Sequence, residues 1–239
     1  MRTIALVVAL ATSVLSLSAA AGEKTYPLLS GRNAVSFNDP QYDRDYIGMA
    51  FVIDHQGRYY GVTAKHVLMV VNHPQIKHVD PRAELKSWTM VAQTQDPKSV
   101  EFGELLNADG TEALDMEVLK VDALVFELDD PGPFTPIKLS KAAPVAGDEL
   151  HALGCTFATS DDCTQDVYSG HFVASTERNL LVDMGDIELG NLRGLSGGPV
   201  LNARGELVGI VSNVMPDANG TARFAPANLD YLRSLLPNS

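Results

Sequence analysis

The sequence predicts an all-β fold of two six-stranded antiparallel barrels followed by a short C-terminal helix. Strand-like segments, in which apolar residues alternate or run together, occur six times on each side of one break. The break is the aspartate-, proline- and glycine-rich run Asp129–Pro133, and we place the linker between the halves at residues 129–146. Helical periodicity is almost confined to the end of the chain. This pattern is typical of two small barrels that pack together.

The first barrel is predicted over residues 30–128. Residues 22–45 are polar and are expected to contribute one short edge strand. A turn is predicted at Ala108–Thr111, and the long apolar run Met116–Leu128 is expected to form the sixth strand. Other elements are predicted as strands at Tyr46–Ile53, Arg58–Thr63, Ala83–Thr94 and Ser99–Leu106, and as a short helical turn at His66–Val71.

The second barrel is predicted over residues 147–225, and the final helix over residues 228–236. Asn228 can cap this helix, whose leucines recur on one face, so we expect it to pack against a barrel. The six strands are expected at Glu149–Leu153, Asp166–Ala174, Asn179–Val182, Pro199–Leu201, Leu207–Val214 and Ala222–Phe224.

The charge balance excludes some classes of partner. The 239 residues carry a formal net charge of −12, which argues against nucleic acids and anionic membrane surfaces as partners. The length allows one large domain or two small ones with a sizeable core.

The N-terminus has the features of a secretory signal peptide. Arg2 gives a positive start, Ile4–Leu17 is apolar, and Ala19–Ala21 supplies small residues for cleavage. We predict a signal peptide at residues 1–21, a mature domain at 22–239, and a secreted or periplasmic protein without stable membrane insertion after cleavage. The alternative is an uncleaved anchor, but the apolar run is shorter than the roughly 20 residues that a span needs.

Export changes the interpretation of the two cysteines, Cys155 and Cys163. In an oxidising compartment we predict a disulfide that closes the short loop between them. The alternative is a pair of free buried thiols. Two cysteines make a poor metal site, and no histidine lies at ligand spacing beside them, so no metal is predicted.

A glycine-rich segment, Gly194–Val200, carries one serine. Ser196 lies between glycines, which permit a tight turn that directs successive amides toward one point. Its hydroxyl could attack a carbonyl, and the amides of Gly194 and Ser196 could hold the resulting oxyanion. The alternative is a glycine-rich hairpin turn without chemistry.

Two upstream segments favour the chemical interpretation. Gly61–Val67 follows a strand-like run and contains His66, and Asp122 opens the apolar run Asp122–Leu128, so the order is His, Asp, Ser. With the serine motif, these segments resemble the chymotrypsin-like (trypsin-fold) serine peptidases, in particular their bacterial secreted and periplasmic branch. Three further segments also resemble strands of this family: Gly48–Asp54, Gly205–Ser212 and Phe224–Pro226.

The resemblance implies a catalytic triad. Ser196 would be the nucleophile, His66 the general base, and Asp122 the acid that orients the histidine. Asp115 also opens a strand-like run and is the alternative acid, although family spacing favours Asp122. Ser212 aligns with a serine that supports the acid by a hydrogen bond; the alternative is an ordinary strand residue.

The resemblance also implies a specificity pocket, with two departures from trypsin. Leu195 stands where trypsin has the aspartate that pairs with its new N-terminus, so activation by such pairing is not expected. Gly190 would form the uncharged base of the pocket, lined by Asn213 and Val214, which favours uncharged side chains. The expected function is an exported serine endopeptidase that acts on proteins or peptides without a cofactor. The alternatives are a catalytically silent binding module and an esterase of small substrates.

Overall fold

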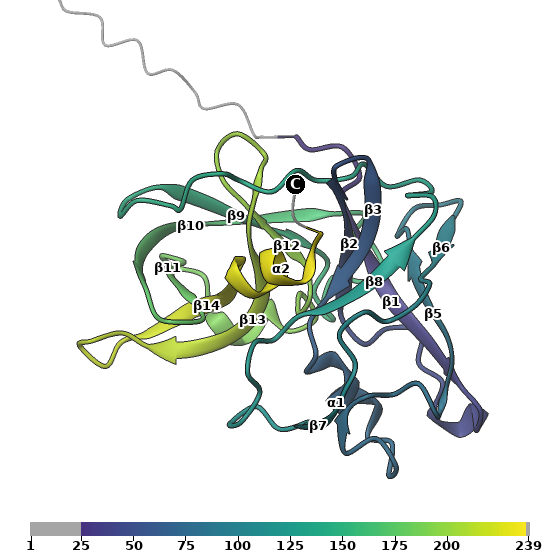
Figure 1. Cartoon of the computed structure of the whole chain (residues 1–239). Coiled ribbons are helices and arrows are strands. Elements are labelled where there is room, and N and C mark those ends of the chain that lie inside the picture. The colour runs from purple at the N-terminus through teal and green to yellow at the C-terminus, as the bar shows by residue number, and fades with distance from the viewer. Residues whose placement is uncertain (1–24, 238–239) are drawn as a thin grey trace, which may run out of the picture.

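The computed structural model describes residues 25–237. Two β-units lie side by side, with the N-terminal half at the right and the C-terminal half at the left in Figure 1. The predicted fold class, mostly β with a short C-terminal helix, is confirmed. The predicted signal peptide, residues 1–21, lies outside the described residues.

The first unit is a six-stranded sheet in the order β6-β5-β1-β2-β3-β8. Its two edges meet, because Gly103 N donates to Glu127 O at 2.9 Å and Leu106 N to Val125 O at 2.8 Å just after β6. The sheet therefore curls around its own apolar core. Its strands are β1 (Ser30–Phe37), β2 (Met49–His55), β3 (Arg58–Thr63), β5 (Leu85–Val91), β6 (Ser99–Glu101) and β8 (Leu124–Leu128).

The second unit is a closed barrel in the order β10-β11-β14-β13-β12-β9. The strand that starts it, β9, pairs with both β10 and β12, which closes the ring. Its strands are β9 (Glu149–Gly154), β10 (Asp166–Ser175), β11 (Leu180–Asp183), β12 (Pro199–Leu201), β13 (Leu207–Pro216) and β14 (Ala222–Asn228).

The two units share an apolar core. Phe51, Val62 and Val125 of the first unit pack with Leu153 and Ile210 of the second in one buried cluster. The linker runs along this junction and pairs with both halves, through the isolated bridges Ile53↔Ile137 and Leu139↔Leu207.

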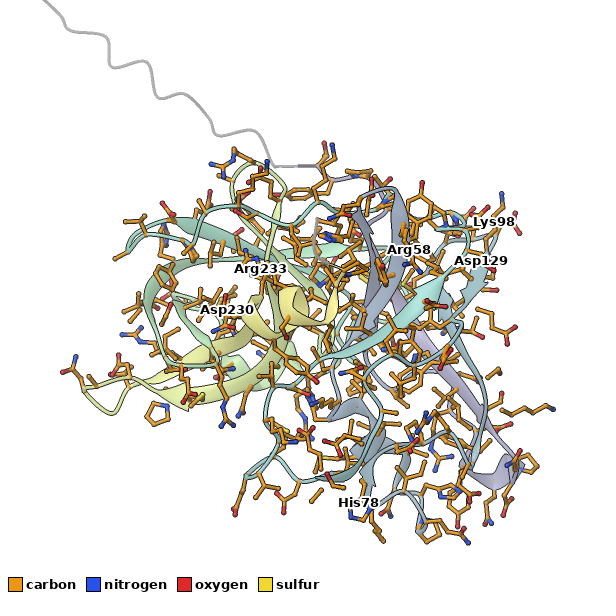
Figure 2. All side chains as sticks on the ribbon, in the orientation of Figure 1. Arg58, His78, Lys98, Asp129, Asp230 and Arg233 are labelled. Atoms are coloured by element: carbon orange, nitrogen blue, oxygen red, sulfur yellow. A yellow bond between two sulfur atoms is a disulfide. The ribbon has the colours of Figure 1, made fainter. Side chains whose placement is uncertain are left out.

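The helices are short: α1 spans Val67–Val71 and α2 spans Asp230–Leu235. Apolar residues of α2 and its flanks join the shared core. Arg233 pairs with Asp230 at 3.2 Å, and both lie on the helix (Figure 2). Arg233 also donates to Ser140 O at 2.7 Å, which ties the helix to the linker. Asn228 was predicted to be the N-cap; the N-cap position is Leu229, while Asn228 Oδ1 accepts from Asp230 N at 3.1 Å. No helix within residues 25–237 is long and apolar enough to cross a membrane.

The prediction of a short edge strand in residues 22–45 was wrong. Strand β1 has eight residues and lies at the centre of the sheet, between β2 and β5. Its polar character is misleading, because the buried Asn33 amide donates to Met49 O and Thr63 Oγ1 and accepts from Trp88 Nε1. A satisfied amide can be buried at modest cost.

The predictions between residues 108 and 128 were also partly wrong. The expected turn at Ala108–Thr111 contains the start of strand β7 (Asp109–Ala113), which pairs with β4 (His78–Val79). Of the predicted strand Met116–Leu128, only the part from Leu124 onward pairs in the sheet. Two of the charged residues that interrupt the earlier part, Glu117 and Lys120, are exposed there, whereas Asp122 is buried.

Candidate active site

His66 lies just beyond β3, at the N-cap of α1. The end of the strand is fixed because the buried Thr63 hydroxyl donates to Met49 O at 2.7 Å. The His66 side chain is 16% exposed, so it is accessible from solvent. Its Nδ1 lies 2.5 Å from Asp122 Oδ2, and its backbone amide donates to Asp122 Oδ1 at 2.9 Å.

Asp122 is buried and receives a third hydrogen bond, from the Ser212 hydroxyl at 2.5 Å. Burial alone would raise the pKa of its carboxyl. The nearby His66 charge and the hydrogen bonds from His66 and Ser212 outweigh burial and lower this pKa. The alternative acid, Asp115, is exposed and accepts instead from the Glu117 amide at 2.9 Å. The geometry brings Asp122, and not Asp115, to the histidine.

Ser196 is half-buried on a glycine turn held by both units. Its carbonyl accepts from Met49 N of β2 at 2.7 Å, and the next amide, Gly197 N, donates to Val211 O of β13 at 2.8 Å. Gly197 has φ of 84°, and a Cβ there would lie 2.2 Å from Thr63 Oγ1. The serine turn therefore packs directly on the strand end that carries His66. Among the described residues, no hydrogen bond joins the Ser196 hydroxyl to His66.

Two amides of this turn are available to a ligand. The amides of Leu195 and Gly198 donate to Leu192 O at 3.1 Å and Leu195 O at 2.8 Å. Within residues 25–237, the amides of Gly194 and Ser196 donate to no protein acceptor. These are the two donors that the sequence assigns to an oxyanion, and Gly194 has φ of 108°, which favours glycine.

The sequence profile of the trypsin-like peptidase domain matches residues 48–210. The chain belongs to the trypsin-like peptidase family. Among solved structures, this trypsin-like peptidase domain is similar to the MamO protease domain from Magnetospirillum magneticum in its apo form. The TM-score is 0.55 and the identity 15%, covering 89% of this chain and 97% of that chain, so this likeness concerns the fold. No curated protein matches the sequence.

The predicted pocket residues of this trypsin-like peptidase domain occupy different surroundings. Asn213 lines a surface pocket of about 190 Å³ that also contains Asp122 and Ser212. Gly190 is exposed in a 3₁₀ turn, and space is open where its Cβ would lie. Val214 is 44% exposed and pairs across strands with the buried Phe224. The pocket that contains Asn213 includes neither Gly190 nor Val214.

The predicted disulfide is confirmed. Cys155 and Cys163 are bonded, with Cα atoms 5.8 Å apart, and the loop that they close lies against Gly194. Among residues 25–237, no group of three or more histidine, cysteine, aspartate or glutamate side chains is arranged to hold a metal ion.

Sequence reasoning missed a buried ion pair beside the histidine. Lys65 Nζ lies 3.0 and 2.9 Å from the two carboxylate oxygens of Glu112, and both side chains are almost fully buried. Glu112 also accepts from Lys120 N at 2.7 Å, and Lys65 Nζ lies 5.0 Å from the centre of the Tyr231 ring. A lysine between alanine and histidine in an apolar stretch was the available signal, because a buried charge requires a partner.

Proposed function

We propose that this trypsin-like peptidase is an exported serine endopeptidase that hydrolyses peptide bonds through an acyl-enzyme. The observation that carries the proposal is the arrangement of Asp122, which accepts from both His66 and Ser212. The turn that bears Ser196 is bonded through Gly197 to Val211, the residue before Ser212. A buried carboxylate on Nδ1 holds the imidazole in the tautomer whose Nε2 can accept a proton.

In the proposed reaction, Ser196 Oγ attacks the peptide carbonyl while His66 Nε2 takes the hydroxyl proton. The negative oxygen that forms is held by the amides of Gly194 and Ser196, which no protein acceptor within residues 25–237 occupies. His66 then gives its proton to the leaving amine, the C–N bond breaks, and an ester to Ser196 remains. Water, deprotonated by His66, hydrolyses this ester and regenerates the serine.

The proposed substrate is a protein or peptide with an uncharged side chain before the cleaved bond. The support is the glycine at position 190 and the aliphatic Val214, which offer no charge to a lysine, arginine or glutamate side chain. Export is proposed from the features of residues 1–21 and from the Cys155–Cys163 disulfide, since disulfides persist in oxidising compartments.

The test uses purified mature protein, casein and a fluorophosphonate probe. We expect casein cleavage and a single labelled serine. Ser196→Ala should lose the label and about 10⁶-fold of turnover. The matched variant Ser87→Ala, in β5, should keep both the fluorophosphonate label and the turnover of the wild type. A wild-type protein that folds but neither cleaves nor labels would favour the silent binding module, and cleavage of esters without peptides would favour the esterase. N-terminal sequencing of the exported protein should begin at residue 22.

A further inference from the structure

The loop closed by the disulfide, Cys155–Cys163, packs on the peptide bond between Arg193 and Gly194. Phe157 N donates to Arg193 O at 2.9 Å. A Cβ on Gly194 would lie 2.4 Å from Phe157 N and 2.9 Å from the carbonyl carbon of Thr156. The two backbones are therefore in direct contact, without room for a side chain at residue 194.

This contact determines the direction of the Gly194 amide. The described peptide bonds are all trans, so the carbonyl of Arg193 and the N–H of Gly194 point in opposite directions. The hydrogen bond from Phe157 holds the carbonyl toward the loop and thus directs the N–H away from it. A rotated peptide would place two N–H groups against each other and turn the carbonyl toward the oxyanion position.

Tyr46, from the segment before β2, connects the disulfide-closed loop and Gly194 to the first unit. Its hydroxyl contacts Cys155 O and lies 3.4 Å from Gly194 O, and its ring packs edge-on against Phe157 at 4.9 Å. Burial raises the pKa of the Tyr46 hydroxyl, so it stays protonated and can donate at neutral pH.

The loop has its own internal restraints. The disulfide joins its ends, and Cys163 N donates to Thr159 O at 2.9 Å. Gln93 Nε2 donates to Ser160 O at 3.3 Å, which adds a second connection to the first unit. Leu195, in the turn that bears Ser196, is fully buried in the barrel core. An ion pair between this turn and a chain terminus would need a carboxylate at this position, and leucine has none.

We propose that Tyr46 and the disulfide-closed loop are positioning elements that hold the Gly194 amide in its oxyanion-binding orientation. The proposal rests on the proposed peptidase function. It assigns to the loop a role in the reaction that goes beyond stabilising the fold, and it makes turnover dependent on the oxidised state of Cys155 and Cys163.

The first experiment compares Tyr46→Phe with Tyr59→Phe, a partly buried tyrosine at the opposite end of β3 from His66. Loss of one oxyanion donor costs about 10²–10³ in kcat, so partial misorientation by Tyr46→Phe should lower kcat about tenfold with KM within about twofold. A peptide boronic acid, whose adduct with serine carries a tetrahedral oxygen, should bind about tenfold more weakly. Tyr59→Phe should change none of these values.

The second experiment compares Cys155→Ala/Cys163→Ala with the oxidised wild type at a temperature where circular dichroism shows both folded. We expect kcat and boronic acid affinity to fall by about 10²-fold, as for the loss of one donor. The ¹⁵N–¹H signal of Gly194 should shift in both the Tyr46 and the cysteine variants. This signal does not depend on turnover.

The outcomes separate the two proposals. An inactive wild-type protein overturns the proposed function, and the Gly194 signal then still tests the loop. An active wild type with unchanged kcat, boronic acid affinity and Gly194 signal in Tyr46→Phe and the cysteine variant overturns the positioning role. Equal losses of kcat in Tyr46→Phe and Tyr59→Phe would also overturn it, because they would indicate a general loss of stability.

Discussion

Lys65 and Glu112 form a buried ion pair in which both carboxylate oxygens face one ammonium group, at 3.0 and 2.9 Å. Lys65 precedes His66, and Glu112 lies ten residues before Asp122. The pair therefore joins the segments that carry the proposed base and its acid, at a place where neither charge reaches water.

Removing one partner of this pair should lower the free energy of unfolding more than removing both. Lys65→Met or Glu112→Leu leaves a buried group without its partner and should destabilise the fold by about 3–5 kcal/mol. The double variant Lys65→Met/Glu112→Leu should recover much of this loss. Urea unfolding of the three variants measures the coupling, and additive losses in the double variant would contradict the expectation.

Asp122→Asn should reduce kcat by about 10⁴-fold without unfolding the protein, because an amide at this position favours the wrong histidine tautomer. The matched variant Asp115→Asn, on the exposed side of the same segment, should stay within about twofold of wild type. Steady-state kinetics on one peptide substrate distinguishes the two aspartates, and a larger loss from Asp115→Asn would reverse their assignment.

Ser212→Ala should change how stability depends on pH. A carboxyl whose pKa is lowered by folding stabilises the protein above its unfolded pKa, about 3.9 for aspartate. This stability is lost as the pH falls through the lower folded pKa. Without the Ser212 hydrogen bond the folded pKa of Asp122 should rise, so the variant should be less stable by about 1.5–3 kcal/mol at pH 7 and converge with wild type in acid.

The check is urea unfolding between pH 2 and 7. Ser87→Ala serves as the control, and its difference from wild type should not vary with pH. A Ser212→Ala difference that is equally independent of pH would mean that the hydroxyl does not stabilise the charged carboxylate.

Gly197→Ala should destabilise the protein far more than Gly57→Ala. Both glycines have positive φ, 84° and 78°, so both variants carry backbone strain of about 1–2 kcal/mol. Only at Gly197 would the new Cβ also meet Thr63 Oγ1 and Met49 O, at 2.2 and 2.3 Å, whereas nothing lies within 4 Å at Gly57. Thermal unfolding and casein cleavage measure the difference, and similar melting temperatures would show that the turn adapts.

Sequence features together with the family resemblance predicted the fold class, and the export signal together with the two cysteines predicted the disulfide. The alternation of apolar residues and the break after Leu128 mark the two units, and the residue types around His66 and Ser196 are specific. The spacing that favoured Asp122 came from the family resemblance, and Asp122 is the aspartate found beside His66.

Contacts between distant segments could not be predicted in this way. Asn33 looks like a loop residue because its partners, among them Thr63 and Trp88, come from other strands. The apolar stretch around Lys65 indicates burial, but its partner Glu112 comes from a distant segment and cannot be identified from the sequence. The contact of Phe157 with Arg193 depends on two loops 36 residues apart, and backbone hydrogen bonds of this kind leave no mark in the residue types.

The apolar cluster shared by both halves has a consequence for how the molecule can be divided. Residues such as Phe51 and Ile210, one from each half, are buried in the same cluster. Cutting the chain in the linker would therefore leave each fragment with a large exposed apolar surface. Neither fragment should persist alone in solution, and the intact protein should melt in one cooperative step. When the two fragments are co-expressed, they should instead associate into a complex with the native fold.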